Sequence, residues 1–159
     1  MSLFSRRSLL FLPLVLAACG FSPVYGTGGT GGQLQNQVEV SEPNDTNGYL
    51  ITRRLEERLG RSGAPTYKLT LNVSTERDSL AVNTESNINR FNLIGEARYV
   101  LVEQATGRVV TSGEVDNFTG SSATGTTLAT QAAARDARER LMILLADQIV
   151  TKLLSADLS

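Results

Sequence analysis

The feature that most constrains the fold is a series of alternating apolar and polar residues that begins after Pro65. Its strongest part spans residues 91–102, with a shorter run at 67–73 and a further strand expected at 108–118. A period of two is typical of a β-strand with one buried face. A polar loop at 83–87 and a turn at 105–107 join these runs. Such short connections predict an antiparallel meander of three strands.

Two other segments have the spacing of helices. Ile51, Leu55 and Leu59 recur every four residues, and residues 128–154 contain neither Gly nor Pro. The stripe of the second segment consists of Leu141, Leu145 and Ile149, widened by Ala134, Ala137, Met142 and Leu153. Residues 45–47 can cap the first helix, and Gly60 can end it. We expect a helix in each segment, the second preceded by a loop at 120–126.

A short strand formed by Leu34, Val38 and Val40 is expected before the first helix. The order is then β-α-β-β-β-α, which predicts an α/β two-layer sandwich with a mixed four-stranded sheet covered on one face by two helices. The other face of such a sheet can stay wet. The residues expected on that polar face are Lys68, Asn72, Arg90, Asn92, Arg98, Glu114 and Asp116.

The composition of the 159-residue chain excludes most enzyme classes. It has no His, one Cys, and 15 basic against 16 acidic residues. The commonest general base and zinc ligand are therefore missing, and the charge is too balanced for a nucleic-acid binder. We expect neither an enzyme nor a metal, cofactor or nucleic-acid site.

Several charged residues could take part in a functional site, but each can also be explained as an ordinary surface residue. Glu114 and Asp116 share one strand face and could act as a pair of carboxylates. They are better explained as exposed polar residues on the surface of the strand. Lys68 and Lys152 are surface lysines by their periodicity. Three arginines, Arg77, Arg90 and Arg98, are candidates for an anionic ligand because a guanidinium binds phosphate bidentately. Their alternative role is to keep strand ends and sheet surface soluble.

The first residues are typical of an export signal. Arg6 and Arg7 precede a short apolar segment at 9–16, too short to span a membrane. The arginine pair also fits twin-arginine export. The segment ends in Leu-Ala-Ala-Cys-Gly at 16–20, which resembles a bacterial lipobox. That resemblance implies cleavage after Ala18 and acylation of Cys19, the only cysteine, and two or more acyl chains anchor firmly.

Three parts of the chain are expected from these signals: a lipoprotein signal peptide at 1–18, a lipid-anchored Gly-rich tether at 19–33, and a folded domain at 34–159. The tether formally matches G-x-G-x-x-G at Gly26, Gly28 and Gly31. A dinucleotide site needs a strand before that motif and a helix after it. The composition instead favours a flexible linker.

Two stretches resemble one family, the LptE-type lipopolysaccharide-assembly lipoproteins. The string Cys-Gly-Phe-Ser-Pro-Val-Tyr-Gly at 19–26 is similar to the opening of the mature family members. Residues 136–153 are similar to the last helix of the family, and the order of elements also agrees. The middle of the chain matches by pattern rather than by motif.

The resemblance implies an outer-membrane lipoprotein on the periplasmic side that pairs with and plugs the LptD β-barrel. Such a protein assists assembly of the barrel and insertion of lipopolysaccharide into the outer leaflet. A polar sheet face suits a barrel lumen, which is itself polar. Two alternatives stay open: an auxiliary lipid-handling lipoprotein of an ABC-type envelope transport system, and a pilotin-like assembly factor.

Overall fold

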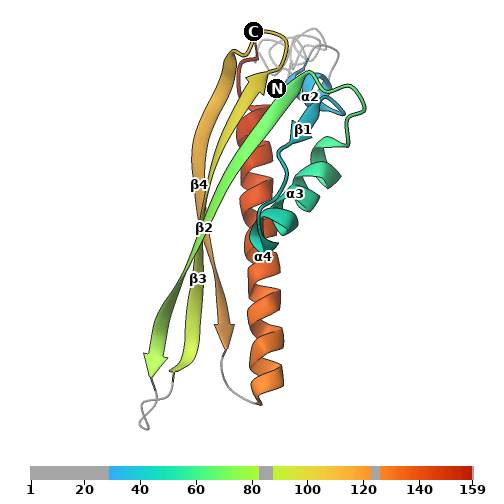
Figure 1. Ribbon diagram of the computed structural model, residues 1–159. Coiled ribbons are helices and arrows are strands. Elements are labelled where there is room, and N and C mark those ends of the chain that lie inside the picture. The colour runs from blue at the N-terminus through green and yellow to red at the C-terminus, as the bar shows by residue number, and fades with distance from the viewer. Residues whose placement is uncertain (1–28, 83–87, 123–125, 159) are drawn as a thin grey trace, which may run out of the picture.

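The computed structural model describes residues 29–82, 88–122 and 126–158 (Figure 1). These residues form three helices and four strands. Their bounds, in chain order, are α2 (Thr30–Leu34), β1 (Val38–Val40), α3 (Thr46–Leu59), β2 (Tyr67–Val82), β3 (Ile88–Glu103), β4 (Val109–Ser122) and α4 (Thr127–Leu154).

The four strands form one sheet in the order β1-β2-β3-β4. β1 runs parallel to β2, and the other two pairs are antiparallel. The sheet is therefore mixed, and the predicted meander is confirmed. α3 and α4 lie against the same face of the sheet (Figure 1). We call this the inner face and the uncovered one the outer face. The predicted α/β sandwich is confirmed, with α2 as an additional short helix.

The local signals for α3 act as predicted. Asp45 is its N-cap, and the Asp45 carboxylate accepts a 2.7 Å hydrogen bond from the amide of Gly48. Gly60 ends the helix with φ of 79°, a left-handed conformation that costs glycine little. Thr126 caps α4 by accepting a 3.2 Å bond from the amide of Ala129.

Two expectations about element bounds were wrong. Leu34 does not belong to the first strand: it ends α2 and is fully buried, so its apolar character reflects packing rather than strand alternation. Gly120 to Ser122 are not loop residues but the end of β4. They pair with β3, Gly120 opposite Asn92 and Ser122 opposite Arg90. Hydrogen bonding to a neighbouring strand overrides their weak intrinsic preference for β structure.

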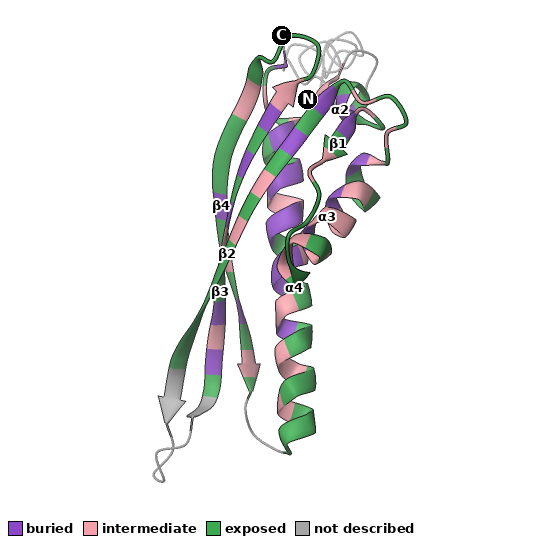
Figure 2. Cartoon of the chain, in the orientation of Figure 1, coloured by how far each residue is buried: buried purple, intermediate pink, exposed green. Residues whose placement is uncertain are grey.

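The core lies between the inner face and the helices (Figure 2). Alternate residues of β3, including Leu93, Ala97 and Leu101, are buried against the stripe predicted for α4, in which Leu141, Leu145 and Ile149 are fully buried. The outer face keeps the predicted polar residues in exposed or intermediate positions.

The two covering helices differ in length. α4 has 28 residues and α3 has 14, so they span about 42 Å and about 21 Å at the usual rise of an α-helix. Only α4 reaches along the whole sheet (Figure 1). Residues 74–79 of β2 are consequently all exposed, although the same strand is partly buried nearer its start.

The elongated domain has two distinct ends. α2 meets the end of α4 at one of them, where the Thr30 hydroxyl donates a 3.5 Å hydrogen bond to the carbonyl of Ala156. We call this the basal end, and it also holds the β3–β4 turn (Figure 1). The opposite, distal end holds the end of β2, the starts of β3 and α4, and the end of β4.

Candidate functional site

The structure separates the three arginines that the sequence indicated. Arg90 and Arg98 both belong to β3, but eight residues of strand place them about 26 Å apart. Arg77 lies on β2 opposite Leu93, on the inner face. The three side chains therefore do not form one anion site.

Arg98 is engaged by acidic neighbours on the outer face. Its Nη2 lies 2.7 Å from Oε1 of Glu96, and its Nε lies 2.8 Å from Oε2 of Glu114. The hydrogen bond to Glu114, followed by the charge of Glu96, raises the pKa of Arg98. Two carboxylates already occupy this guanidinium, so Arg98 is poorly placed to bind an anionic ligand.

Arg77 makes a different contact, at the distal end of the inner face. Its Cζ lies 4.0 Å from the centre of the Phe91 ring, a cation–π arrangement. Phe91 is only 3% exposed, so the ring holds the guanidinium in place. Stacking uses the face of the guanidinium and leaves its N–H groups at the edge available to an acceptor.

A hollow of about 340 Å³ lies at the distal end of the β3–β4 pair. It is lined by Arg90, Phe91, Asn92, Gly120, Ser121 and Ser122. The buried hydroxyl oxygen of Ser121 has no hydrogen-bond partner in the described part of the chain. The hollow thus combines an exposed arginine with an unpartnered hydroxyl, which suits an anionic ligand.

Sequence reasoning did not single out Arg135 and Arg138 of α4. Within residues 29–82, 88–122 and 126–158, they share with Arg77 and Arg90 the property of having no ion-pair partner. All four belong to the distal half of the domain. Local sequence gave no signal for this, because each α4 arginine has an acidic residue nearby in the chain. Only the fold decides which acids pair.

The arginines of α3 serve the packing of the two long helices. Arg54 forms a two-pronged contact with Asp147 of α4, its Nε 3.1 Å from Oδ1 and its Nη2 3.0 Å from Oδ2. Arg53 donates a 2.7 Å bond to Glu139. Because acidic residues of α4 already pair with these two arginines, they are poorly placed to form an anion site.

The other sequence candidates are also placed by the structure. Glu114 pairs with Arg98 on the exposed face, and Lys68 and Lys152 are exposed. Among the described residues, no group of three His, Cys, Asp or Glu side chains could hold a metal ion. Gly31 is buried within α2, whereas Cys19, Gly26 and Gly28 lie outside the described residues.

Comparison with protein families identifies the class of protein that this domain represents. The model of the LptE family, described as lipopolysaccharide-assembly, matches residues 35–153, which include every described element except α2. The chain therefore belongs to the LptE family, a family of assembly lipoproteins rather than enzymes. No curated protein sequence matches the chain.

Solved structures of bacterial lipoproteins share the fold. A lipoprotein from Caulobacter crescentus is 28% identical, with a TM-score of 0.69 over 82% of this chain and 96% of that one. Rare lipoprotein B from Shewanella oneidensis is 18% identical, with a TM-score of 0.58 over 75% and 92% of the two chains. Lipoprotein B from Nitrosomonas europaea is 13% identical, with a TM-score of 0.56 over 74% and 81%.

Neither α4, the longest of the described helices, nor any other of them combines the length and apolar character needed to cross a bilayer.

Proposed function

We propose that this protein is an outer-membrane lipoprotein that pairs with an LptD-type β-barrel and plugs its lumen. In this role it assists assembly of the barrel and insertion of lipopolysaccharide into the outer leaflet. Membership of the LptE family supports the role in lipopolysaccharide assembly. The lipid anchor is Cys19, exposed by cleavage after Ala18, and it holds the domain on the periplasmic side of the membrane.

The observation that carries the plug proposal is the uncovered outer face. Three strands of 14 to 16 residues present a polar surface over which no described helix lies (Figure 2). A barrel lumen is polar, so a domain that fills it needs a polar surface of this kind rather than an apolar one.

The placement of the two ends supports an orientation relative to the membrane. The described chain begins at the basal end, ten residues after Cys19, and an extended segment of that length reaches at most about 36 Å. The basal end therefore stays within that distance of the anchor. The distal end, with Arg77 and Arg90, lies at the other end of the 28-residue α4 from the start of the described chain.

Contact with lipopolysaccharide is assigned to the distal end on chemical grounds. This ligand carries phosphate groups, and Arg77, held over the buried Phe91 ring, offers a guanidinium that can bind them. Arg90, Arg135 and Arg138 add positive charge that no described carboxylate neutralises. Arg98, in contrast, is not assigned a ligand.

Affinity capture of the tagged full-length protein from detergent-solubilised outer membranes tests this function. Mass spectrometry and quantification of what co-purifies should reveal an LptD-type barrel in about equal amount, together with lipopolysaccharide. Capture of ABC-transporter components would favour an auxiliary transport lipoprotein, and capture of a secretin would favour a pilotin-like factor. Either result without the barrel would contradict the plug proposal.

A further inference from the structure

The outer face has an ordered pattern that the strand register creates. Along the sheet, cross-strand rows follow one another: Asp78, Asn92 and Gly120; Glu76, Ile94 and Phe118; Ser74, Glu96 and Asp116; Asn72, Arg98 and Glu114. Residues directly opposite each other have Cβ atoms about 5 Å apart, so each row and its neighbours form one continuous surface.

Ile94 and Phe118 form an apolar pair in the middle of this surface. Ile94 is 40% exposed and Phe118 is 61% exposed, although the rows on either side contain only polar residues and glycine. Gly120, the next outward residue of β4, leaves open space beside Phe118, because a Cβ there would meet only Asn92, at 3.7 Å. An exposed aromatic and a β-branched side chain, side by side on a polar face, are typical of a binding surface.

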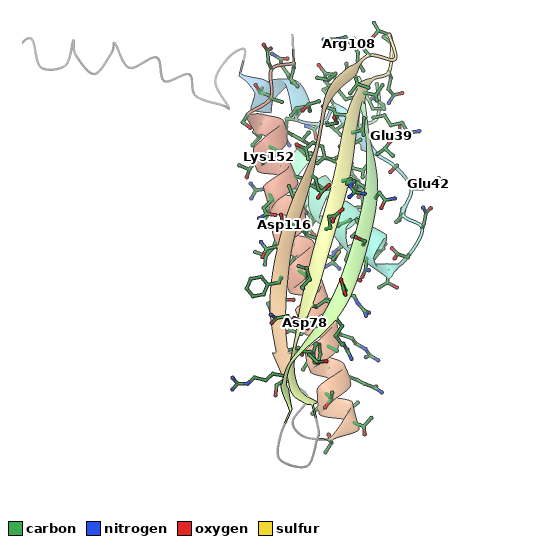
Figure 3. All side chains as sticks on the ribbon, turned by 90° about the vertical axis from the view of Figure 1, so that its left-hand side faces the viewer. Glu39, Glu42, Asp78, Arg108, Asp116 and Lys152 are labelled. Carbon is green, nitrogen blue, oxygen red and sulfur yellow. The ribbon has the colours of Figure 1, made fainter. Side chains whose placement is uncertain are left out.

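The charges around this pair are predominantly negative. Glu76 lies in the same row, Asp78 in the row on one side, and Glu96 and Asp116 in the row on the other side. Arg98 neutralises Glu96, but Glu76, Asp78 and Asp116 have no ion-pair partner in the described part of the chain. Figure 3 shows Asp78 and Asp116 on the same side of the sheet. Arg90 is two rows from the pair, at the distal margin.

The apolar pair and the acidic residues around it indicate what kind of molecule can bind here. The phosphate groups of a lipid would be repelled by the acidic ring, whereas lysine and arginine side chains would be attracted to it. The apolar pair needs an apolar side chain or backbone to cover it. A polypeptide with both basic and apolar side chains would match this surface. Lipopolysaccharide would not, because its phosphate groups are negatively charged.

We propose that the outer face centred on Ile94 and Phe118 is a protein-docking surface that receives a basic, partly apolar stretch of the inner wall of the partner barrel. This inference rests on the proposed function and adds that two parts of the domain bind different ligands. The part of the outer face around Ile94 and Phe118 binds polypeptide, and the distal end of the domain, with Arg77 and Arg90, binds the anionic lipid.

The first test is capture of the barrel by the full-length lipoprotein carrying Phe118→Asp. A matched control is Val109→Asp, because Val109 is 56% exposed and lies on the same strand, opposite Val102, near the basal end. We expect Phe118→Asp to reduce barrel capture about tenfold, the scale of losing a central interface anchor, and Val109→Asp to leave it near the wild-type value. Equal capture by both variants would overturn the docking surface.

A second variant tests the role of charge and does not remove an apolar side chain. Asp78→Lys combined with Asp116→Lys should weaken capture of the barrel and should not lower the amount of co-purified lipopolysaccharide. Glu39→Lys combined with Glu42→Lys, at exposed acids of β1 and of the loop before α3, is the control for the same change of charge. Unchanged barrel capture together with more bound lipopolysaccharide would identify a lipid as the occupant and overturn the proposal.

The outcome separates this inference from the proposed function. If the wild-type protein captures the barrel and both outer-face variants do so equally well, the docking surface is wrong and the plug function stands. If the wild-type protein captures no barrel, the plug function fails and the docking surface fails with it. Thermal unfolding of each variant near the wild-type temperature shows that the fold is retained.

Discussion

The hydroxyl of Thr119 donates a 2.8 Å hydrogen bond to the backbone carbonyl of Ala137, and this bond joins the edge strand β4 to the middle of α4. Thr119 is only 7% exposed. Beside it, Nη2 of Arg140 donates to the carbonyl of Gly120 at 3.3 Å. Together these contacts tie the edge strand β4 to α4, beside the packing of Val115 in the core.

Replacing Thr119 by valine keeps the shape of the side chain and removes the bond. We expect a loss of about 1 kcal/mol in the free energy of unfolding, the usual net value of a buried hydrogen bond. Thr70→Val on the exposed face of β2 is the matched control and should be neutral. Denaturant unfolding of the full-length proteins in detergent measures the free energy of unfolding of each variant. Equal values for the two variants would show that the hydrogen bond does not stabilise the fold.

Gly95 marks the closest approach of the sheet to α4. A Cβ at this position would lie 2.9 Å from Cδ2 of Leu141 and 3.0 Å from Cδ1 of Leu145. Gly95→Val should therefore overpack the core and cost about 1–3 kcal/mol. Gly120→Val has open space and should be neutral or stabilising in a strand. A thermal unfolding temperature that falls equally in both variants would contradict this explanation.

The Arg54–Asp147 pair should stabilise the contact between α3 and α4. Asp147→Asn is expected to cost no more than about 1 kcal/mol, because the two side chains are 28% and 37% exposed and solvent screens them. The effect should shrink in high salt. Glu56→Gln, which breaks a pair with the 81% exposed Arg61, should have a smaller effect. Unfolding of both variants at low and high salt shows whether Asp147→Asn loses more stability than Glu56→Gln.

The pH dependence of that contribution follows from the arginine. The hydrogen bond to Asp147 is the main cause that raises the pKa of Arg54 above its ordinary value. A group whose folded pKa is raised contributes fully below its unfolded pKa and loses that contribution as the pH rises through the folded value. The part due to Arg54 should therefore be constant through the neutral range and disappear only in strongly alkaline solution.

Arg77 provides a test of lipid binding at the distal end. Arg77→Ala should weaken binding of purified lipopolysaccharide about tenfold, the loss that corresponds to one charge-assisted contact of about 1.4 kcal/mol. Arg98→Ala is the matched control, because Glu96 and Glu114 already hold that side chain. A fluorescence titration of the full-length protein in detergent measures both, and a larger loss for Arg98 would reverse the assignment.

Cys19 provides a test of the anchor. Cys19→Ala should abolish acylation, which intact-protein mass spectrometry detects as the missing mass of the acyl groups. Pairing with the barrel should survive in part, because the protein interface contributes independently of the lipid. Complete loss of pairing would show instead that the anchor is needed to bring the two partners together.

Local patterns in the sequence were enough to predict the elements of the sandwich and their order, apart from the short helix α2. The alternation at 91–102 and the four-residue steps of Leu141, Leu145 and Ile149 are local patterns, and each correctly predicted a strand or a helix together with its buried side. The cap at Asp45 and the stop at Gly60 were also local, because neighbouring backbone groups are their partners. From these patterns the α/β sandwich followed.

The properties of the exposed surfaces depend on contacts between segments that are distant in the chain. Leu34 was predicted in a strand but lies in a helix. Residues 120–122 form part of a strand because β3 lies beside them. Arg98 and Arg77 look alike in sequence, yet one is neutralised by acids and the other stacks on Phe91. The strand register likewise brings Ile94, Phe118 and their acidic neighbours together from three strands. Pairing between distant segments sets the register, and periodicity along one segment cannot encode it.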